Sequence, residues 1–340
     1  MTDEARQQRN FFLTPKWGLV IAAAVLLIVG GLVVFVPYYQ KVKLVREIEP
    51  MEYAYFEVNR GEPDWLLEWL EDDRSALIPT QAFEKTSLRP FDTIIKVSVI
   101  GKVVDDQWLK RLTICSELES LSLFETQVSG KGLVYLKYFP NLVDLCIYDS
   151  ELSEGDLRSL HDLPKLIHLV LDYTKAGDDF LESLTCHNTL KTMSLEETEM
   201  CDNGLRHLSS FRELELLSLA GTDIGDDGIQ HLKGLPKLES LDLSETKITN
   251  DGLRHLKAIP NLSRIYLKGT AITDEGLAHF RGMKNLFVVS LKETNISIEG
   301  LRHLGKLKEL YCIYISEDNI QLKKEFPNLS GVYFIKDEIL

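Results

Sequence analysis

Residues 238–261 read LESLDLSETKITNDGLRHLKAIPN, and this stretch decides the fold. Its first leucine belongs to a series in which each leucine lies 24 residues after the one before it. The series consists of Leu118, Leu142, Leu166, Leu190, Leu214, Leu238, Leu262, Leu286 and Leu310. A fixed period of about 20–29 residues with the spacing L-x-x-L-x-L is typical of solenoids in which every unit supplies one short strand. A degenerate copy that begins at Ile94 and a shortened copy that begins at Leu329 extend the array at both ends.

The second half of each unit predicts a short helix. Residues 252–256 read GLRHL, and the spacing of their leucines places both on one helical face. Thr249, Thr273 and Ser297 stand where a side chain can cap such a helix, and Pro260 follows at a position that ends one. A strand followed by a helix in every unit predicts an α/β solenoid, with a curved parallel sheet inside and short helices outside.

These units resemble the bacterial leucine-rich repeat proteins over residues 94–334, and in particular relatives of the cysteine-containing class found beside F-box domains. The resemblance implies recognition of other proteins through the concave strand face, and it implies no particular reaction. In several membrane-anchored members a Trp- and Leu-rich segment precedes the repeats, and residues 63–70, PDWLLEWL, look like that segment. The third repeat departs from the pattern, because Phe180 replaces the glycine and residues 185–188 replace the usual ending. We expect a local irregularity there.

An apolar segment near the N-terminus predicts a membrane helix. Residues 17–36 carry no charged side chain, and a helix of that length spans about 30 Å, the thickness of a bilayer's hydrocarbon core. A buried core helix and a cleaved signal peptide are the alternatives. The run is longer than a signal-peptide core, and residues 35–39, FVPYY, offer no small-residue cleavage site. We therefore expect an uncleaved transmembrane helix at residues 17–39, in contact with the lipid bilayer through residues 17–36.

This helix divides the chain into four parts. Residues 1–16 are an N-terminal tail, residues 40–93 are a linker and N-terminal cap segment, and residues 94–340 are the leucine-rich repeat domain. Basic residues on the two sides of the span nearly balance, so the charge rule for orientation gives a weak signal. The short tail and Lys16 favour a cytoplasmic N-terminus, which places the repeats on the outer, non-cytoplasmic side of a single-pass membrane protein.

Composition excludes several classes of function. The chain has 38 basic and 52 acidic residues and a net charge of −14, which argues against nucleic-acid binding. Five cysteines are too few for a disulfide scaffold, and their odd number and irregular positions suggest free thiols. The sequence contains no nucleophile elbow, phosphate-binding loop or H-E-x-x-H motif. We expect a protein without enzymatic activity or cofactor.

Three rows of polar side chains occur at fixed repeat positions. A hydroxyl follows each strand, and we expect it to help bond the backbone of the neighbouring coil; this hydroxyl row is Thr126, Ser150, Thr174, Thr198, Thr222, Thr246, Thr270 and Thr294. A carboxylate precedes many of these hydroxyls, in a row interrupted by Tyr173, Gly221 and Gly269; its members are Glu125, Asp149, Glu197, Glu245, Glu293 and Glu317. We interpret it as a solvated rim rather than a calcium site.

A third row, in the helical layer, holds five histidines; they are His207, His231, His255, His279 and His303. Neighbouring elements there lie about 8–10 Å apart, whereas a zinc ion needs each ligand at about 2.0–2.1 Å. We therefore predict no metal site.

Strand alternation predicts that the side chains two, four and six places after each leading leucine line the concave face. Acidic residues dominate the first part of this face and basic residues the later part, with aromatic residues in both. The candidate partner-binding residues are Phe124, Tyr148, Asp172, Glu196, Asp242, Arg264, Tyr266, Lys268, Lys292 and Tyr314. Ten strands would give a surface about 45–50 Å long, which suits a protein or extended peptide better than a metabolite.

Two interpretations of this face remain open. In the first, the basic patch from Arg264 to Lys292, with Tyr266, binds an acidic segment of a partner protein. In the second, these residues only keep the face soluble.

The sequence thus predicts a membrane-anchored protein-binding scaffold. The competing prediction is a ubiquitin-ligase-type substrate adaptor, by analogy with F-box relatives. Such an adaptor needs a second, partner-recruiting domain, and residues 41–93 are short for one.

Overall fold

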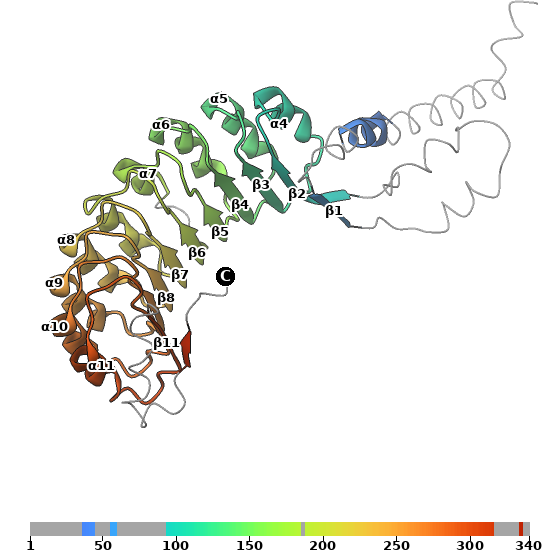
Figure 1. The fold of residues 1–340 in the computed structure, drawn as a ribbon. Helices are drawn as coiled ribbons and strands as arrows, with labels where there is room; N and C mark the ends of the chain where they lie inside the picture. Colours follow the sequence, from blue (N-terminus) through green and yellow to red (C-terminus); the bar gives the residue numbers. More distant parts are fainter. Residues whose placement is uncertain (1–35, 45–54, 60–92, 185–187, 316–332, 336–340) are drawn as a thin grey trace, which may run out of the picture.

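The computed structural model describes residues 36–44, 55–59, 93–184, 188–315 and 333–335. Over the repeats these residues form a curved solenoid, with strands along its inner side and helices along its outer side (Figure 1). The strand-inside, helix-outside arrangement predicted from the repeat is confirmed.

The inner side is one 12-stranded sheet in which the strands follow one another in chain order. Each residue of a repeat strand pairs with the residue 24 positions further along, as Leu121 does with Leu145 and Leu145 with Leu169. The parallel strands are β2 (Thr93–Ile100), β3 (Ser120–Phe124), β4 (Asp144–Tyr148), β5 (His168–Val170), β6 (Thr192–Ser194), β7 (Leu216–Ser218), β8 (Ser240–Asp242), β9 (Arg264–Tyr266), β10 (Val288–Ser290), β11 (Cys312–Tyr314) and β12 (Tyr333–Ile335). The degenerate first copy and the shortened last copy thus both supply a strand.

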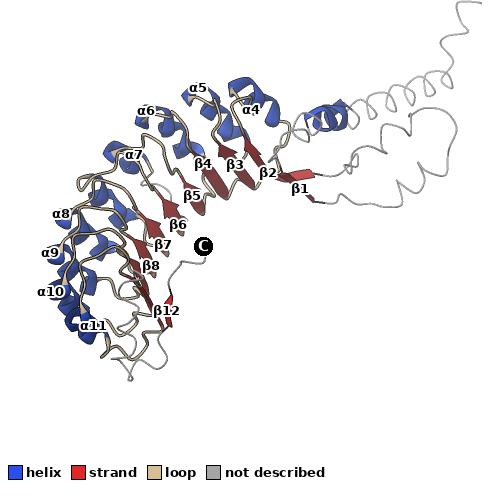
Figure 2. Ribbon diagram, in the orientation of Figure 1, coloured by secondary structure: helices blue, strands red, loops and turns tan. Residues whose placement is uncertain are grey.

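The outer side consists of one short helical segment per repeat (Figure 2). The α-helices are α4 (Asp106–Leu112), α5 (Gly130–Leu133), α6 (Glu154–Leu157), α7 (Asp178–Ser183), α8 (Asp226–Ile229), α9 (Asn250–Leu253), α10 (Asp274–Leu277) and α11 (Ile298–Leu304). The 3-10 helices are η2 (Val134–Tyr138), η3 (Arg158–Asp162), η4 (Gly204–Ser210), η5 (Gln230–Gly234), η6 (Arg254–Ala258) and η7 (Ala278–Phe280). The predicted caps Thr249 and Ser297 accept hydrogen bonds from the N–H groups of Asp251 and Glu299. Thr273 makes no such bond; its hydroxyl instead accepts a hydrogen bond from the side-chain amide of Asn250.

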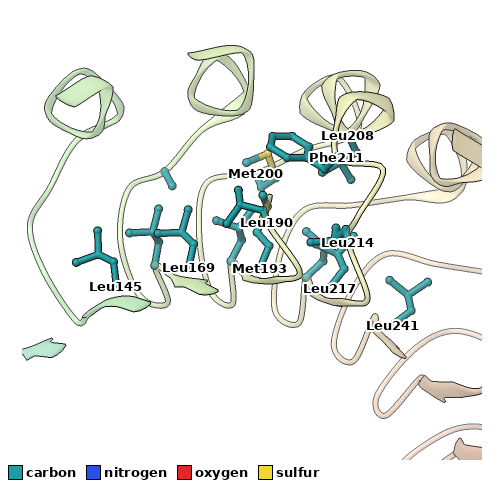
Figure 3. Close-up of a cluster of buried hydrophobic side chains, with 14 of the residues drawn as sticks. Leu145, Leu169, Leu190, Met193, Met200, Leu208, Phe211, Leu214, Leu217 and Leu241 are labelled. Atoms are coloured by element: carbon teal, nitrogen blue, oxygen red, sulfur yellow. The ribbon is translucent and has the colours of Figure 1, made fainter. Parts of the chain in front are cut away.

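The core is a continuous column between the two layers. Leu241 and Leu243, from the strand of the quoted unit, are fully buried, as is the leading Leu238. In the repeat that begins at Leu190, Met193 and Phe211 fill the space between strand and helix (Figure 3). Burial of this repeated apolar set, unit upon unit, supplies the main driving force for the fold.

A side-chain oxygen at the start of most helices, usually of an acid, ties one repeat to the next. The carboxylate of Asp226 accepts from the backbone N–H of Thr249 at 2.8 Å and from its hydroxyl at 2.6 Å. The same carboxylate occupies the space beside Gly252, where a Cβ atom would lie 2.4 Å from Asp226 Oδ1. This close approach explains the glycine that begins the GLRHL segment.

Three pairs vary this acid–glycine contact, and in one of them Asn250 stands in for the acid beside Gly276. In another the residue types are exchanged, and a Cβ atom on Gly130 would collide with the side chain of Asp156. In the third repeat the pair is Glu154 and Phe180, and the longer carboxylate accepts from the Phe180 backbone N–H at 2.6 Å while the ring is buried. The exchange of contact at Phe180 is therefore a local irregularity, as expected, whereas residues 185–187, the other part of that expectation, lie outside the described residues.

The N-terminal edge of the sheet is covered by β1 (Tyr55–Asn59), which pairs antiparallel with β2. Residues 36–44 form a helix in which Tyr38, Val42 and Leu44 are buried and belong to the core cluster. The predicted boundary between the membrane helix and the linker, at residues 39 and 40, falls inside this helix.

Most of the predicted transmembrane helix, and the whole Trp- and Leu-rich segment at 63–70, lies outside the described residues. Within the described part of the chain, no helix combines the length and the apolar character that a membrane crossing requires.

Candidate protein-binding site

The inner face of the sheet presents the side chains that alternate with the buried leucines. Phe124 and Tyr148 end β3 and β4, as strand alternation predicts for positions six places after the leading leucine. Asp172, Glu196 and the later members at that position follow strands β5 to β11, which are only three residues long. Just beyond β5 the carboxylate of Asp172 accepts a hydrogen bond from the Glu196 backbone N–H at 2.9 Å. These side chains therefore lie in the turn beyond the strand.

A row of three aromatic rings follows this edge of the sheet through successive repeats. The ring centroids of Phe124 and Tyr148 lie 5.9 Å apart, and those of Tyr148 and Tyr173 lie 5.0 Å apart. Tyr173 is 46% exposed. We name Phe124, Tyr148 and Tyr173 the aromatic rim. The sequence prediction included the first two and missed the third, which counted only as an interruption of the carboxylate row.

The residue at the Tyr173 position has a left-handed backbone in eight repeats. The non-glycine members, all with φ between 49° and 56°, are Glu125, Asp149, Tyr173, Glu197, Glu245 and Glu293. Gly221 and Gly269 adopt the same conformation, with φ of 66° and 68°. Glycine adopts the left-handed conformation without steric cost. We therefore attribute these two glycines to the backbone conformation of the turn rather than to relief of repulsion between neighbouring carboxylates. Two glycines at one repeat position were the sequence signal for this turn.

Carboxylates flank the aromatic rim along the same turn. We name Glu125, Asp149, Glu196 and Glu197 the acidic flank. Burial raises the pKa of the Tyr173 hydroxyl, and the nearby Tyr148, Glu197 and Glu196 raise it further. Glu196 also accepts a hydrogen bond from the Ser218 hydroxyl at 2.7 Å, which holds its side chain toward the inner face. The rim is therefore aromatic and electronegative.

The basic part of the inner face has its own counter-charges. The Lys268 ammonium lies 3.0 Å from Glu245 and 3.8 Å from Glu293. Asp242 and Tyr266 are paired neighbours on β8 and β9, and Ser290, between Tyr266 and Tyr314 on the sheet, is fully buried. The sheet thus brings the C-terminal candidates together. The charge of Lys268, one of the three basic residues predicted to bind an acidic partner, is therefore offset within the chain.

The hydroxyl row behaves differently from the prediction. Thr246 donates to the carbonyl of Leu243 at 2.6 Å, which is in its own coil, and five other threonines of the row do the same. The expected bond to the neighbouring coil is therefore wrong, because the left-handed turn brings the hydroxyl back over its own strand. Thr126 and Ser150 are exceptions, since their hydroxyls are buried and have no partner among the described residues.

Cysteines and histidines of the described region show no reactive arrangement. Burial raises the pKa of the Cys115 and Cys146 thiols to about 12, so both stay protonated. The Cys201 thiol donates to Asp178 at 2.8 Å and replaces the hydroxyl that caps other repeats. Over the part of the chain that the structure describes, no three His, Cys, Asp or Glu side chains converge as metal ligands.

A leucine rich repeat family model matches residues 234–256 of the chain. A search of curated protein sequences gives no match. Among solved structures, internalin C2 from Listeria monocytogenes aligns with a TM-score of 0.49 and 22% identity, over 70% of this chain and 90% of that one. An internalin (inlF) from the same organism aligns with a TM-score of 0.48 and 16% identity, over 80% of this chain and 94% of that one. The matched residues overlap the quoted unit, whose strand keeps the 24-residue register of the sheet.

Proposed function

We propose that this chain is a membrane-anchored scaffold, without enzymatic activity, that binds a protein partner on the inner face of its solenoid. The observation that carries the proposal is the contrast between positions. Interior positions hold an apolar residue in every unit, whereas the inner face and its rim hold Phe, Tyr, Asp, Glu, Arg and Lys in a non-repeating order. Aromatic and charged side chains on a broad surface are the kind that anchor protein interfaces.

The proposed anchor is the uncharged segment at residues 17–36. Its test is fractionation of cells that express the full chain. We expect the protein to stay with membranes after an alkaline carbonate wash, and the double variant Leu26→Arg, Leu27→Arg to be released, because two charges at the centre of a span are costly. Release of the unchanged protein would contradict the anchor.

We place the repeats on the non-cytoplasmic side. Free thiols are an objection to that side, but burial of Cys115 and Cys312 and the hydrogen bond of Cys201 weaken it. Protease added to intact cells is expected to digest the repeats. Protection of the repeats until the membrane is permeabilised would reverse the assignment.

Partner binding is tested by cross-linking in the same cells. A photo-cross-linking amino acid replaces Ser122, on β3 of the inner face, or Lys137, exposed on η2 of the outer side. We expect a discrete protein adduct from the Ser122 position and none from the Lys137 position. Equal adducts from both positions, or none from either, would contradict inner-face binding.

The ubiquitin-ligase-type adaptor gains no support from the fold. The described residues before the repeats form one helix, at 36–44, and one strand, β1, and both pack against the solenoid. Neither provides a recruiting surface separate from the repeats.

A further inference from the structure

The aromatic rim has features that the rest of the inner face lacks. Its three rings come from three successive repeats, and their centroids follow one another at 5.9 and 5.0 Å. Tyr173 holds its ring at the edge in a left-handed backbone, where two other repeats place glycine. A bulky residue in that conformation is strained, and such strain is typically retained where a side chain serves function rather than stability.

The charge around the rim is not neutralised within the described chain. Glu245 and Glu293, at the equivalent position in later repeats, share Lys268. By contrast, among the residues that the structure describes, no member of the acidic flank lies within ion-pair distance of a basic side chain. The rim therefore presents ring faces together with carboxylates that form no ion pair with another described residue.

Two unsatisfied hydroxyl groups provide an independent sign of a missing ligand. Thr126 and Ser150 follow Phe124 and Tyr148 by two residues, and they are only 8% and 7% exposed. Their hydroxyls lack partners in the described structure, although six other members of the row bond to their own coil. Thr126 also lines a surface hollow with Glu125, Asp149 and the basic Lys102, which forms no ion pair with either carboxylate. A buried polar group without a partner is costly, so a ligand whose binding shifts the turn and gives these hydroxyls a hydrogen-bond partner would be favoured there.

We propose that the aromatic rim, with its acidic flank, is the docking surface for an extended arginine- or lysine-rich segment of the partner; this inference rests on the proposed function. Cationic groups are attracted both to the faces of aromatic rings and to carboxylates. Arginine, with five N–H donors and no acceptor, suits a site that offers ring faces, carboxylate oxygens and hydroxyl oxygens. Three strands cover about 10 Å, the length of about three extended residues, so a short cationic motif spans the rim.

The test measures peptide binding to the full chain in non-ionic detergent by fluorescence anisotropy. The probes are a labelled peptide of four Arg-Gly-Ser units and a matched peptide of four Glu-Gly-Ser units. We expect the arginine peptide to bind and the glutamate peptide not to bind. Absence of arginine-peptide binding, or tighter binding of the glutamate peptide, would overturn the proposal.

Tyr173→Gly tests the role of the ring. Glycine is compatible with the left-handed turn, so the variant keeps the backbone while it removes the aromatic face. We expect the affinity for the arginine peptide to fall about fivefold or more. Phe287→Ala is the matched control, because Phe287 is 42% exposed and stacks on Tyr311 at 5.0 Å, outside the rim. An unchanged affinity in Tyr173→Gly, or an equal loss in the control, would contradict the assignment.

The charge is tested by the double variant Asp149→Asn, Glu197→Gln. Its control is Glu245→Gln, Glu293→Gln, which makes the same change in net charge at the same repeat position elsewhere. We expect only the first variant to weaken binding and to reduce its dependence on salt. Equal effects in both variants would indicate nonspecific attraction to an acidic protein and would overturn the proposal.

Failure of this inference is distinguishable from failure of the proposed function. If Ser122 still cross-links to a partner while the rim variants bind the arginine peptide normally, the inner face is a binding site and the cationic assignment is wrong. If Ser122 forms no adduct, the proposed function itself fails.

Discussion

Two positions of each repeat contrast with one another: the interior position, five residues after the leading leucine, and the rim position, seven residues after it. The first is a buried apolar residue in each unit, as at Leu123, Leu171 and Leu243. The second is Glu, Asp, Tyr or Gly, always with a left-handed backbone where the structure describes it. The interior position takes an apolar residue in every unit because each coil stacks on a neighbour of the same shape. The rim position is constrained only in its backbone, so its side chain is free to vary with function.

The largest effect is expected at an interior position. Leu243→Ala removes a fully buried side chain in the middle of the array and should lower the free energy of unfolding by about 2–5 kcal/mol. Urea denaturation followed by circular dichroism measures it. A loss below about 0.5 kcal/mol would mean that this position does not lie in the core.

The acid–glycine contact between repeats is expected to be the next most sensitive feature. In Gly252→Ala the new Cβ atom meets Asp226 Oδ1 at 2.4 Å, so the variant should lose about 1–3 kcal/mol. Gly155→Ala is the control, because the nearest atom to its Cβ would be Ser153 Oγ at 3.9 Å. The same denaturation experiment should find the control as stable as the unchanged protein, or more so. Equal losses in both would indicate a helix-propensity effect rather than a collision.

The periodic part of this comparison was predictable from sequence. The leucine series identifies the interior, because a residue type repeated every 24 positions must occupy equivalent places in stacked coils. The reason for the glycine was harder to see, since Asp226 and Gly252 belong to different repeats. The exchange at Gly130 and Asp156 was a visible clue to it.

The rim was predicted only in part. Phe124 and Tyr148 follow from strand alternation, whereas Tyr173 lies one residue beyond the alternating positions and reaches Tyr148 because the chain turns left-handed there. The pattern of charges in the sequence also does not reveal which charged side chains form ion pairs within the chain. Lys268 belongs to a predicted basic patch, but its contacts with Glu245 and Glu293 depend on side chains from adjacent repeats meeting at the rim.

A smaller effect is expected at Asp172, beside the aromatic rim. Burial raises the pKa of this carboxyl, although hydrogen bonds from Ser194 and from the Glu196 backbone oppose the shift. The folded protein thus holds the proton to higher pH than the unfolded chain, and the contribution of Asp172 to stability falls as pH rises through the range between those two pKa values. Asp172→Asn keeps an acceptor and removes the charge.

We expect Asp172→Asn to equal or exceed the unchanged protein in stability at neutral pH, by no more than about 1 kcal/mol. The advantage should shrink toward about pH 3, where the aspartate is protonated in both states. Denaturation at the two pH values measures it. A variant that is less stable at neutral pH and equally stable in acid would reverse the assigned direction of the pKa shift.

The smallest change in stability is expected at the rim itself, and it tests the central claim most directly. Tyr173→Gly relieves a left-handed residue, worth about 1–2 kcal/mol, and loses a ring contact worth about 0.5–1.5 kcal/mol, so the two terms nearly cancel. The measurement pairs urea denaturation with arginine-peptide titration on one preparation of the full chain. We predict a free energy of unfolding within about 1 kcal/mol of the unchanged protein. We also predict that the affinity for the arginine peptide falls about fivefold or more. A variant that keeps its affinity, or loses it only together with its fold, would contradict the division between a structural interior and a recognition rim.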